Sequence, residues 1–251
     1  MTVRTCAKVN LGLHIMRRRP DGYHDLETLF LPYTGMGDEL TVEPAEELSI
    51  HIDGCTWDPQ KDLTVQAWRL LKADFTDLPP VSIRLAKHVP VGAGLGGGSA
   101  DGAFALKCMN EIFSLGLDDD ALRLYASHLG SDCAFFVDCR PMYATGRGEI
   151  LESMDMDLSA YEIKVQVPEG VSVSTREAYS GVVPDASRKP LRDLLREPVA
   201  AWKDVIGNDF EATVFPLHPE IAALKEKMYA DGAIYAAMSG SGSAVWGLFK
   251  R

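Results

Sequence analysis

The N-terminal part of the chain alternates between apolar and polar positions with a period of two, the spacing of half-buried β-strands. The segments "AKVNLGLHI" (residues 7–15), "YHDLETLFLPY" (23–33) and "DELTVE" (38–43) each follow this pattern. The first two are separated by "RRRPDGYH", in which Pro-Asp-Gly is a turn signal. The sequence therefore predicts a hairpin with Arg17 to Arg19 at its solvated tip.

The middle of the chain changes to the spacing of amphipathic helices. Apolar residues recur three or four positions apart over residues 62–75, 99–115 and 118–130, and Gly116 and Gly130 are plausible C-terminal stops. Between the first two helices, "VSIRLAKHVP" (81–90) is expected to form a strand that leads into a glycine-rich loop. The pattern thus predicts strand, loop and helix in direct succession.

The C-terminal part mixes both periods. Residues 161–168 alternate as a strand, and helices are expected over residues 176–182, 191–204 and 219–232. "AIYAAM" and "AVWGLF" flank "SGSGS" and predict two strands joined by a tight connection. Because residues 151–160 have no clean period, we place a boundary there. The prediction is an α+β protein with lobes at residues 1–155 and 156–251.

Composition and charge limit the classes of function. The chain has 251 residues, 46% of them hydrophobic, and a net charge of -11. An acidic chain is a poor partner for nucleic acid, although a small phosphorylated ligand needs only local positive potential. The N-terminal arginines follow the apolar stretch, unlike those of a signal peptide, and no run reaches the roughly 20 apolar residues of a membrane span. We therefore expect a cytoplasmic protein that binds neither nucleic acid nor membrane.

The cysteines give no sign of a disulfide framework or a zinc site. Their number is odd and none form a C-x-x-C pair. We expect reduced, mostly buried thiols at Cys6, Cys55, Cys108, Cys133 and Cys139.

The glycine-rich loop "PVGAGLGGGSAD" (90–101) is the clearest candidate site, because five of the seven residues from Gly92 to Gly98 are glycine. A loop of this kind that opens into a helix can direct backbone N–H groups at an anion, and the helix dipole adds positive potential. Gly92, Gly94 and Gly97 satisfy G-x-G-x-x-G, but the preceding strand is too polar for a dinucleotide fold. A Walker A loop needs a lysine that is absent here. Ser99 is expected at the N-cap position, where its hydroxyl could also reach a phosphate or a metal.

Three other segments carry polar residues that could take part in chemistry. Lys8 and Asn10 lie two positions apart and so on one face of the first strand, which is either its wet side or a functional surface. Asp132 in "GSDCAFF" either caps a helical turn or accepts a proton from a hydroxyl, as phosphoryl transfer to an alcohol requires. The "SGSGSA" segment (239–244) favours a second loop of close backbone approach over a plain turn.

Taken together, these segments resemble the GHMP kinases. The phosphate loop of that superfamily is similar to "PVGAGLGGGSA", and its late glycine-rich motif is similar to "SGSGSA". The resemblance implies a two-lobed fold, with an N-terminal lobe like ribosomal protein S5 domain 2, a C-terminal ferredoxin-like lobe, and the active site in the cleft between lobes. It implies ATP and Mg²⁺ as cofactors. "RPDGYHDLETLF", "ATGRGE" and the order of all motifs are most similar to the branch that phosphorylates the 2-hydroxyl of a cytidine-diphosphate-linked methylerythritol in isoprenoid biosynthesis.

The resemblance also implies roles for individual residues. Lys8 and Asp132 match the catalytic lysine and aspartate, and Asn10 and Lys87 match polar contacts to the substrate. Tyr23, His24 and Tyr179 match the residues that enclose and hydrogen-bond the cytosine. The metal ligands stay unassigned, and the protein is expected to be a monomer or a homodimer. The residues that match the ATP-phosphate loop are Pro90, Val91, Gly92, Ala93, Gly94, Leu95, Gly96, Gly97, Gly98, Ser99 and Ala100, and those of the C-terminal loop are Ser239, Gly240, Ser241 and Gly242.

The chain departs from the family pattern at a few positions. Ala100 and Asp101 stand where "SN" is common, and Asp62 stands where an asparagine that contacts adenine is frequent. The role of Asp101 beside a phosphate loop is the open question. Three alternatives remain at this point: a GHMP kinase of the mevalonate or homoserine type, a non-catalytic sensor with the same fold, and a dinucleotide-dependent oxidoreductase.

Overall fold

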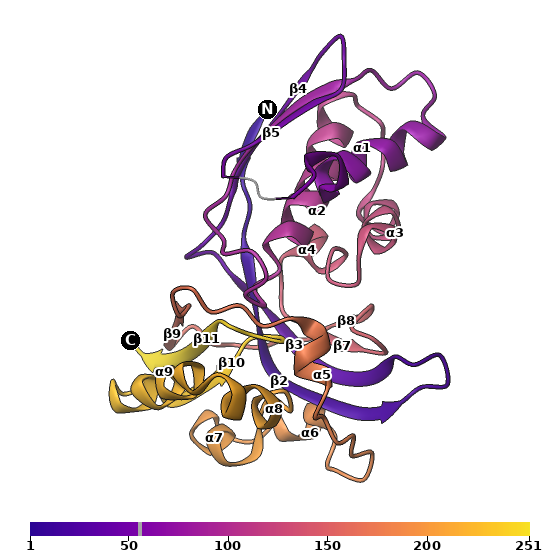
Figure 1. Ribbon diagram of the computed structural model, residues 1–251. Helices are drawn as coiled ribbons and strands as arrows, with labels where there is room; N and C mark the ends of the chain where they lie inside the picture. The colour runs from indigo at the N-terminus through magenta and orange to yellow at the C-terminus, as the bar shows by residue number, and fades with distance from the viewer. Residues whose placement is uncertain (55–56) are drawn as a thin grey trace. The chain divides into compact units, whose positions relative to one another are not determined.

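A computed structural model describes residues 1–54 and 57–251, so Cys55 lies outside the described residues. Contacts divide the chain into two compact units (Figure 1), each made of several segments. Unit 1 comprises Met1–Ala7, Thr34–Val91 and Gly96–Cys139, and unit 2 comprises Lys8–Tyr33, Gly92–Leu95 and Arg140–Arg251. The predicted lobes were continuous in sequence, whereas these units interleave. The boundary at residue 155 stays a prediction.

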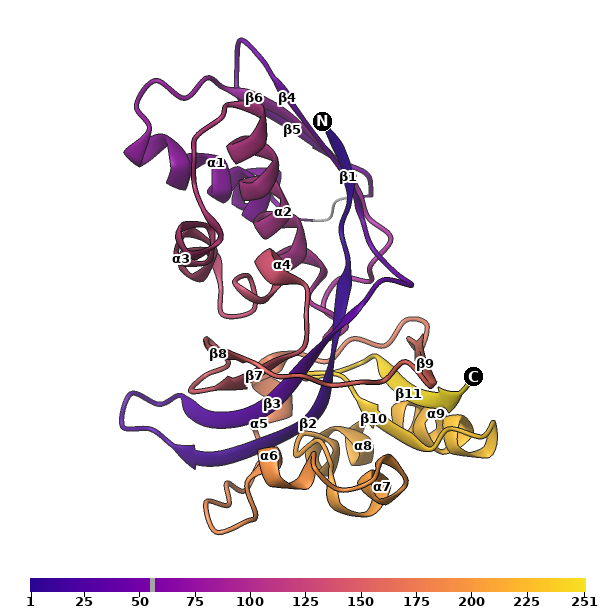
Figure 2. The same cartoon turned by 180° about the vertical axis from the view of Figure 1, so that it is seen from behind.

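Unit 1 is built on a four-stranded sheet with the order β1-β4-β6-β5, in which only the β5–β6 pair is parallel. The strand predicted within residues 81–90 is confirmed as Val81–Ala86, in which Val81, Ile83 and Leu85 are buried and Arg84 is exposed. Four helices lie on one face of this sheet (Figures 1 and 2). The strands are β1 (Thr2–Arg4), β4 (Glu39–Pro44), β5 (Ser49–Ile52) and β6 (Val81–Ala86).

The helices of unit 1 confirm the three predicted from apolar spacing. They are α1 (Leu63–Asp74), α2 (Gly97–Ile112), α3 (Asp119–Leu129) and the short α4 (Phe135–Asp138), and a 3-10 turn at Pro59–Lys61 precedes α1. Helix α2 starts two residues earlier than expected. Its buried face is rich in glycine and alanine, and a Cβ on Gly102 would lie 2.9 Å from Leu63 Cβ. Small residues therefore allow α2 to pack closely on α1.

Unit 2 contains two antiparallel sheets. The four-stranded sheet has the order β2-β3-β7-β8 and carries the predicted hairpin, and the three-stranded sheet has the order β10-β11-β9. The two predicted C-terminal strands pair antiparallel, with Ala237 opposite Trp246. The strands are β2 (Ala7–Arg18), β3 (His24–Tyr33), β7 (Met142–Thr145), β8 (Ile150–Ser153), β9 (Tyr161–Gln166), β10 (Tyr235–Met238) and β11 (Val245–Lys250).

The helices of unit 2 are short, except α9, which packs on β10 and β11 (Figure 2). The prediction of a single helix over residues 191–204 is wrong, because the segment forms two short helices with a 3-10 turn between them. Helix α6 ends at Leu194, and Pro198, which disfavours helical geometry at the residue before it, separates α6 from the turn and the helix that follow. The helices are α5 (Thr175–Tyr179), α6 (Leu191–Leu194), α7 (Trp202–Val205), α8 (Glu211–Leu217) and α9 (Pro219–Ala230), with a 3-10 turn at Val199–Ala201.

The described cysteines agree with the expectation of unlinked thiols. Cys6, Cys108 and Cys133 are buried and Cys139 is partly buried, and all four are free. Burial raises the pKa of the Cys108 thiol to about 11, which keeps it protonated at neutral pH. Among the residues that the structure describes, no helix is long and apolar enough to cross a membrane.

Candidate active site

In unit 2, the two polar residues of the first long strand are buried together. Lys8 and Asn10 have exposed fractions of 3% and 2%, so their face of β2 is not the wet side of an edge strand. Lys8 Nζ donates a hydrogen bond to Asn10 Oδ1 at 2.6 Å and lies 5.1 Å from the centroid of the Phe30 ring. The Asn10 amide donates in turn to the Thr28 hydroxyl at 3.0 Å. Burying an ammonium group costs free energy because the charge loses contact with water, and this cost favours a functional role for Lys8.

Also in unit 2, the C-terminal glycine loop packs directly on the first half of the phosphate loop. A Cβ on Gly94 would lie 2.0 Å from the Ser239 carbonyl oxygen, and Gly94 has a φ of +78°. The Ser239 hydroxyl donates to the Gly94 carbonyl at 2.8 Å, and the Lys8 backbone N–H donates to the Leu95 carbonyl at 2.9 Å. The prediction of a second loop of close approach is confirmed. Part of the glycine content of both loops serves their mutual contact.

Two residues that the sequence did not point out support this arrangement. The Asn208 side-chain amide donates to the carbonyls of Met238 and Gly240, both at 2.8 Å. Trp246 Nε1 donates to the Asn10 carbonyl at 3.0 Å. Both residues act on backbone far away in sequence, so no local signal could have identified them.

In unit 1, helix α2 begins at the second half of the glycine loop. Its N-cap is Gly96 in the left-handed conformation, with a φ of +73°, and Ser99 is the third residue of the helix. The prediction that Ser99 is the N-cap is therefore wrong, because the glycine allows an earlier turn into the helix. A Cβ added to Gly98 would lie more than 4 Å from the atoms of the described residues outside its own stretch of helix. An anion can approach the unpaired N–H groups and the positive end of the dipole there.

Asp132 lies in the turn between α3 and α4, also in unit 1, and is partly exposed. The N-cap of α4 is Ala134, so Asp132 is not the N-cap of that helix. Burial raises the pKa of the adjacent Cys133 thiol to about 12; a hydrogen bond with Ser99 opposes this rise, and the charge of Asp132 adds to it. Ser99 and Asp132 thus act on the same thiol. The start of α2 and the turn of Asp132 are neighbours.

Lys87, matched to a substrate contact, is held by two carboxylates of unit 1. Its ammonium donates to Asp38 and to Asp101, the latter at 2.6 Å, and its side chain is 11% exposed. Burial acts to lower the pKa of Lys87, but Asp101 and then Asp38 raise it above its usual value. The ammonium is therefore charged and already satisfied within the fold, and a role for Lys87 in substrate binding stays a prediction.

Both acidic departures from the family pattern have partners inside unit 1. Asp101 faces Lys87 and the Thr5 hydroxyl, and its exposed fraction is 1%. Asp62 is the N-cap of α1 and accepts from the Thr64 N–H at 3.0 Å. Each carboxylate is thus engaged by protein donors.

The aromatic residues matched to base recognition come from two elements of unit 2. The rings of His24, the first residue of β3, and Tyr179, the last residue of α5, stack with centroids 4.9 Å apart. Tyr23 is 58% exposed, and the guanidinium of Arg147 lies 5.0 Å from its ring centroid. Burial lowers the pKa of His24, and the positive charge of Arg18 lowers it further. A neutral imidazole of this kind can both donate and accept a hydrogen bond.

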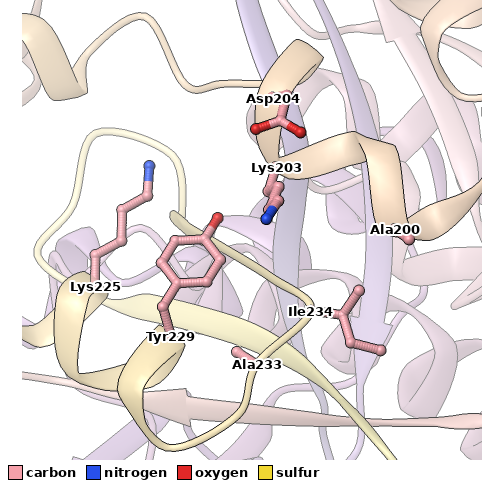
Figure 3. Close-up of a pocket in the computed structure, with 7 residues that line it drawn as sticks. All are labelled: Ala200, Lys203, Asp204, Lys225, Tyr229, Ala233 and Ile234. Atoms are coloured by element: carbon pink, nitrogen blue, oxygen red, sulfur yellow. The ribbon is translucent and has the colours of Figure 1, made fainter.

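A separate pocket in unit 2 has a volume of about 570 Å³ (Figure 3). Its polar side chains are largely used by the fold, since Lys225 pairs with Glu211 at 2.6 Å and the Tyr229 hydroxyl is hydrogen-bonded to Ala236. None of the residues matched to the kinase site above lines this pocket. Its lining residues are Ala200, Lys203, Asp204, Lys225, Tyr229, Ala233 and Ile234.

Comparison with known proteins decides the family. The model of the GHMP kinases N terminal domain matches residues 62–139, and that of the GHMP kinases C terminal domain matches residues 191–251. The chain belongs to the GHMP kinases. Its members use ATP and phosphorylate small molecules, so the alternative of a dinucleotide-dependent oxidoreductase is wrong. The predicted two-lobed α+β fold is confirmed at the level of this family.

Similarity to individual GHMP kinases extends over nearly the whole chain. The chain is 47% identical to the 4-diphosphocytidyl-2-C-methyl-D-erythritol kinase of Bacteroides fragilis, over 97% of this chain and 90% of the relative. A crystal structure of 4-(cytidine 5'-diphospho)-2C-methyl-D-erythritol kinase superposes with a TM-score of 0.83 at 34% identity, and covers 99% of this chain and 90% of that one. The homoserine kinase of Cytophaga hutchinsonii shares the fold, with a TM-score of 0.73 at 14% identity and coverage of 99% and 85%.

Proposed function

We propose that this GHMP kinase transfers the γ-phosphoryl group of ATP to the 2-hydroxyl of 4-diphosphocytidyl-2-C-methyl-D-erythritol, in the non-mevalonate route to isoprenoids. The observation that carries the proposal is the 47% identity, over nearly the full length, to relatives named for this kinase activity. Homoserine and mevalonate kinases share the fold at 11–18% identity, which supports no claim about their substrates.

ATP would bind along the glycine-rich loop, from Pro90 to Ala100. The N-terminus of the 16-residue helix α2 supports this assignment, because its first N–H groups can bind phosphate oxygens, and no described side chain outside its own stretch of helix lies within 4 Å of a Cβ added to Gly98. The described residues contain no cluster of three metal-ligating side chains. Mg²⁺ commonly keeps its waters and binds through substrate phosphates and few protein groups. The Ser99 hydroxyl, in the first turn of α2, would donate to a phosphate oxygen, and Mg²⁺ bound to the phosphates would neutralise part of their charge.

Lys8 and Asp132 would perform the chemistry. Asp132 would accept or orient the proton of the attacking 2-hydroxyl, and its partial exposure leaves it accessible to a substrate. The buried Lys8 ammonium would stabilise the negative charge of the transferred phosphoryl group. Phosphoryl transfer depends mainly on positioning and electrostatic stabilisation, so a fixed lysine, Mg²⁺ and backbone N–H groups can supply most of the effect.

The cytosine of the substrate would be recognised by Tyr23, His24 and Tyr179. His24 and Tyr179 already stack on each other, so the base would extend or open this stack, and the His24 imidazole offers both a donor and an acceptor to the base edge. Asn10 would contact the substrate next to Lys8, and Ser239 to Gly242 would support the phosphate loop. Because mevalonate and homoserine carry no base, these aromatic residues favour a cytidine-containing substrate. We further propose that the protein is cytoplasmic, because ATP is its phosphoryl donor. We also propose that it is a monomer or a homodimer.

The variant Asp132→Ala tests the mechanism, with Ser131→Ala in the same turn as the matched control. We expect Asp132→Ala to lose nearly all turnover, by at least about 100-fold, because general base catalysis contributes roughly 10²–10⁴ in rate. The far-ultraviolet circular dichroism of both variants should stay native. Substantial phosphorylation by Asp132→Ala, or an equal loss in Ser131→Ala, would refute the role of the carboxylate.

A further inference from the structure

Unit 1 contains a buried cluster of three charged side chains from three separate segments. Asp38 lies just before β4, Lys87 follows β6, and Asp101 is the fifth residue of α2. The ammonium of Lys87 bridges the two carboxylates, whose side chains are 0% and 1% exposed. The two carboxylates thus share one ammonium group inside unit 1.

The remaining oxygen atoms of both carboxylates are also occupied. Asp38 Oδ1 accepts from the backbone N–H groups of His88 and Val89, at 2.5 and 2.7 Å. Asp101 Oδ1 accepts from the Thr5 hydroxyl at 3.3 Å, and that hydroxyl accepts from the Asp38 N–H at 3.0 Å. Because buried ionic groups hold a defined geometry only when each member is satisfied, this cluster is a rigid connection.

The cluster meets the chain on both sides of the glycine-rich loop. Residues 87–89 stand immediately before Pro90, and Asp101 stands immediately after Ala100. A Cβ on Gly97 would lie 2.9 Å from the Val89 side chain, so the start of α2 also packs on the entrance of the loop. Both ends of the segment that would hold phosphate are therefore attached to Asp38. A loop fixed at both ends loses less entropy when it orders its N–H groups around an anion.

We propose that the Asp38–Lys87–Asp101 cluster clamps the two ends of the phosphate loop, and that Asp101 is thereby a positioning residue for ATP. This inference rests on the proposed function, in which the loop holds the ATP phosphates. It explains why a carboxylate is present beside a site for phosphate: its charge is directed at Lys87 and Thr5.

The cluster gives the clamp a dependence on pH. Burial raises the pKa of Asp101 to about 7; Lys87 opposes the rise, and Asp38 and Asp62 add to it. Asp101 therefore takes up a proton as the pH falls through about 7, and its charged hydrogen bond with Lys87 is lost. The clamp is complete above that pH and weakened below it. In Asp101→Asn the group is neutral at every pH and mimics the protonated form.

The test measures the Kd of a non-hydrolysable ATP analogue, without acceptor, by calorimetry at pH 6 and pH 8. At pH 8 we expect Asp101→Ala to weaken binding about tenfold, equivalent to about 1.4 kcal/mol, the size of one hydrogen bond to a charged group. Asp101→Asn, which keeps an acceptor oxygen, should weaken binding about threefold at pH 8 and match the wild type at pH 6. The matched control is Asp120→Asn, which removes an 88%-exposed carboxylate paired with Arg123 and should change nothing.

The outcomes separate positioning from general stabilisation. Weaker binding of the ATP analogue with unchanged binding of the cytidine-containing acceptor supports the clamp. Unchanged Kd in Asp101→Ala, or equal weakening of both ligands, overturns it. If Asp101→Ala does not fold, the Kd of Asp101→Asn at pH 6 and pH 8 is the deciding measurement. A change of Kd between these two pH values that equals the change in the wild type refutes the clamp. A wild type that binds the analogue but phosphorylates nothing contradicts the proposed function alone, and one that does not bind it contradicts both.

Discussion

The contact between the two glycine loops of unit 2 makes a sharp prediction for Gly94→Ala. Gly94 has a φ of +78°, and its new Cβ would lie 2.0 Å from the Ser239 carbonyl oxygen. Gly92 is the matched control, because its φ is +73° and no atom in the described part of the chain, its two chain neighbours aside, lies within 4 Å of its added Cβ. The two substitutions therefore share the backbone strain and differ in the steric clash.

The magnitude follows from these two terms. An L-residue in the left-handed region costs roughly 1–2 kcal/mol, which is the whole expected effect of Gly92→Ala on the free energy of unfolding. In Gly94→Ala the Ser239 backbone must also move by about 1 Å or more, and this motion breaks or lengthens the hydrogen bond of 2.8 Å from the Ser239 hydroxyl to the Gly94 carbonyl. We expect a total of about 4 kcal/mol, at the upper end for single substitutions.

Thermal unfolding of both variants measures the difference. A change of 1 kcal/mol lowers Tm by roughly 2–4 °C in a chain of this size, so Gly92→Ala should lower Tm by about 2–8 °C and Gly94→Ala by at least about 8 °C. Phosphoryl transfer should fall by about 100-fold in Gly94→Ala, since a displacement near 1 Å can cost that much. Equal shifts of Tm in the two variants would refute the close approach of the loops.

Two further predictions concern the chemistry and the recognition of the base. Lys8→Met removes the cation beside Asn10 and should lower kcat by about 10²–10³ with native circular dichroism, because one electrostatic donor is typically worth that much; a single-turnover rate within tenfold of the wild type would contradict this. Tyr179→Ala should raise the KM of the cytidine-containing acceptor by roughly 5- to 150-fold, the equivalent of 1–3 kcal/mol of stacking, and leave the KM of ATP unchanged. Tyr179→Phe keeps the ring and should retain the wild-type KM; a loss as large as that of Tyr179→Ala would argue against stacking.

Local patterns predicted the elements that carry the site. Alternation identified β2 and β3, and helical spacing identified α1, α2 and α3, although β2 is buried on both faces over residues 7–15. The prediction of one helix over residues 191–204 is wrong because α6 ends at Leu194 and Pro198 prevents a continuous helix through the residue before it, despite the apolar spacing. Ser99 failed as an N-cap because Gly96 turns the chain into the helix three residues earlier. Both errors come from backbone geometry that hydrophobic periodicity does not contain.

The partners of the site residues could not be predicted, because they are distant in sequence. Asp101 and Lys87 are 14 positions apart and Lys87 and Asp38 are 49 apart, and nothing near any of them indicates burial. The support that Asn208 gives to the C-terminal glycine loop is equally non-local. The motifs thus indicated candidate site residues, and the structure shows which hydrogen bonds and ion pairs fix the position of those residues within each unit.

The central claim is tested most directly by identifying the phosphorylated product. The purified wild-type protein is incubated with γ-³²P-labelled ATP, Mg²⁺ and one acceptor at a time: 4-diphosphocytidyl-2-C-methyl-D-erythritol, mevalonate or homoserine. We predict that label is transferred only to the first acceptor, with one ADP released per transfer, and that ³¹P nuclear magnetic resonance places the new phosphate on the 2-hydroxyl. Transfer only to mevalonate or homoserine, or no transfer to any acceptor, would contradict the account.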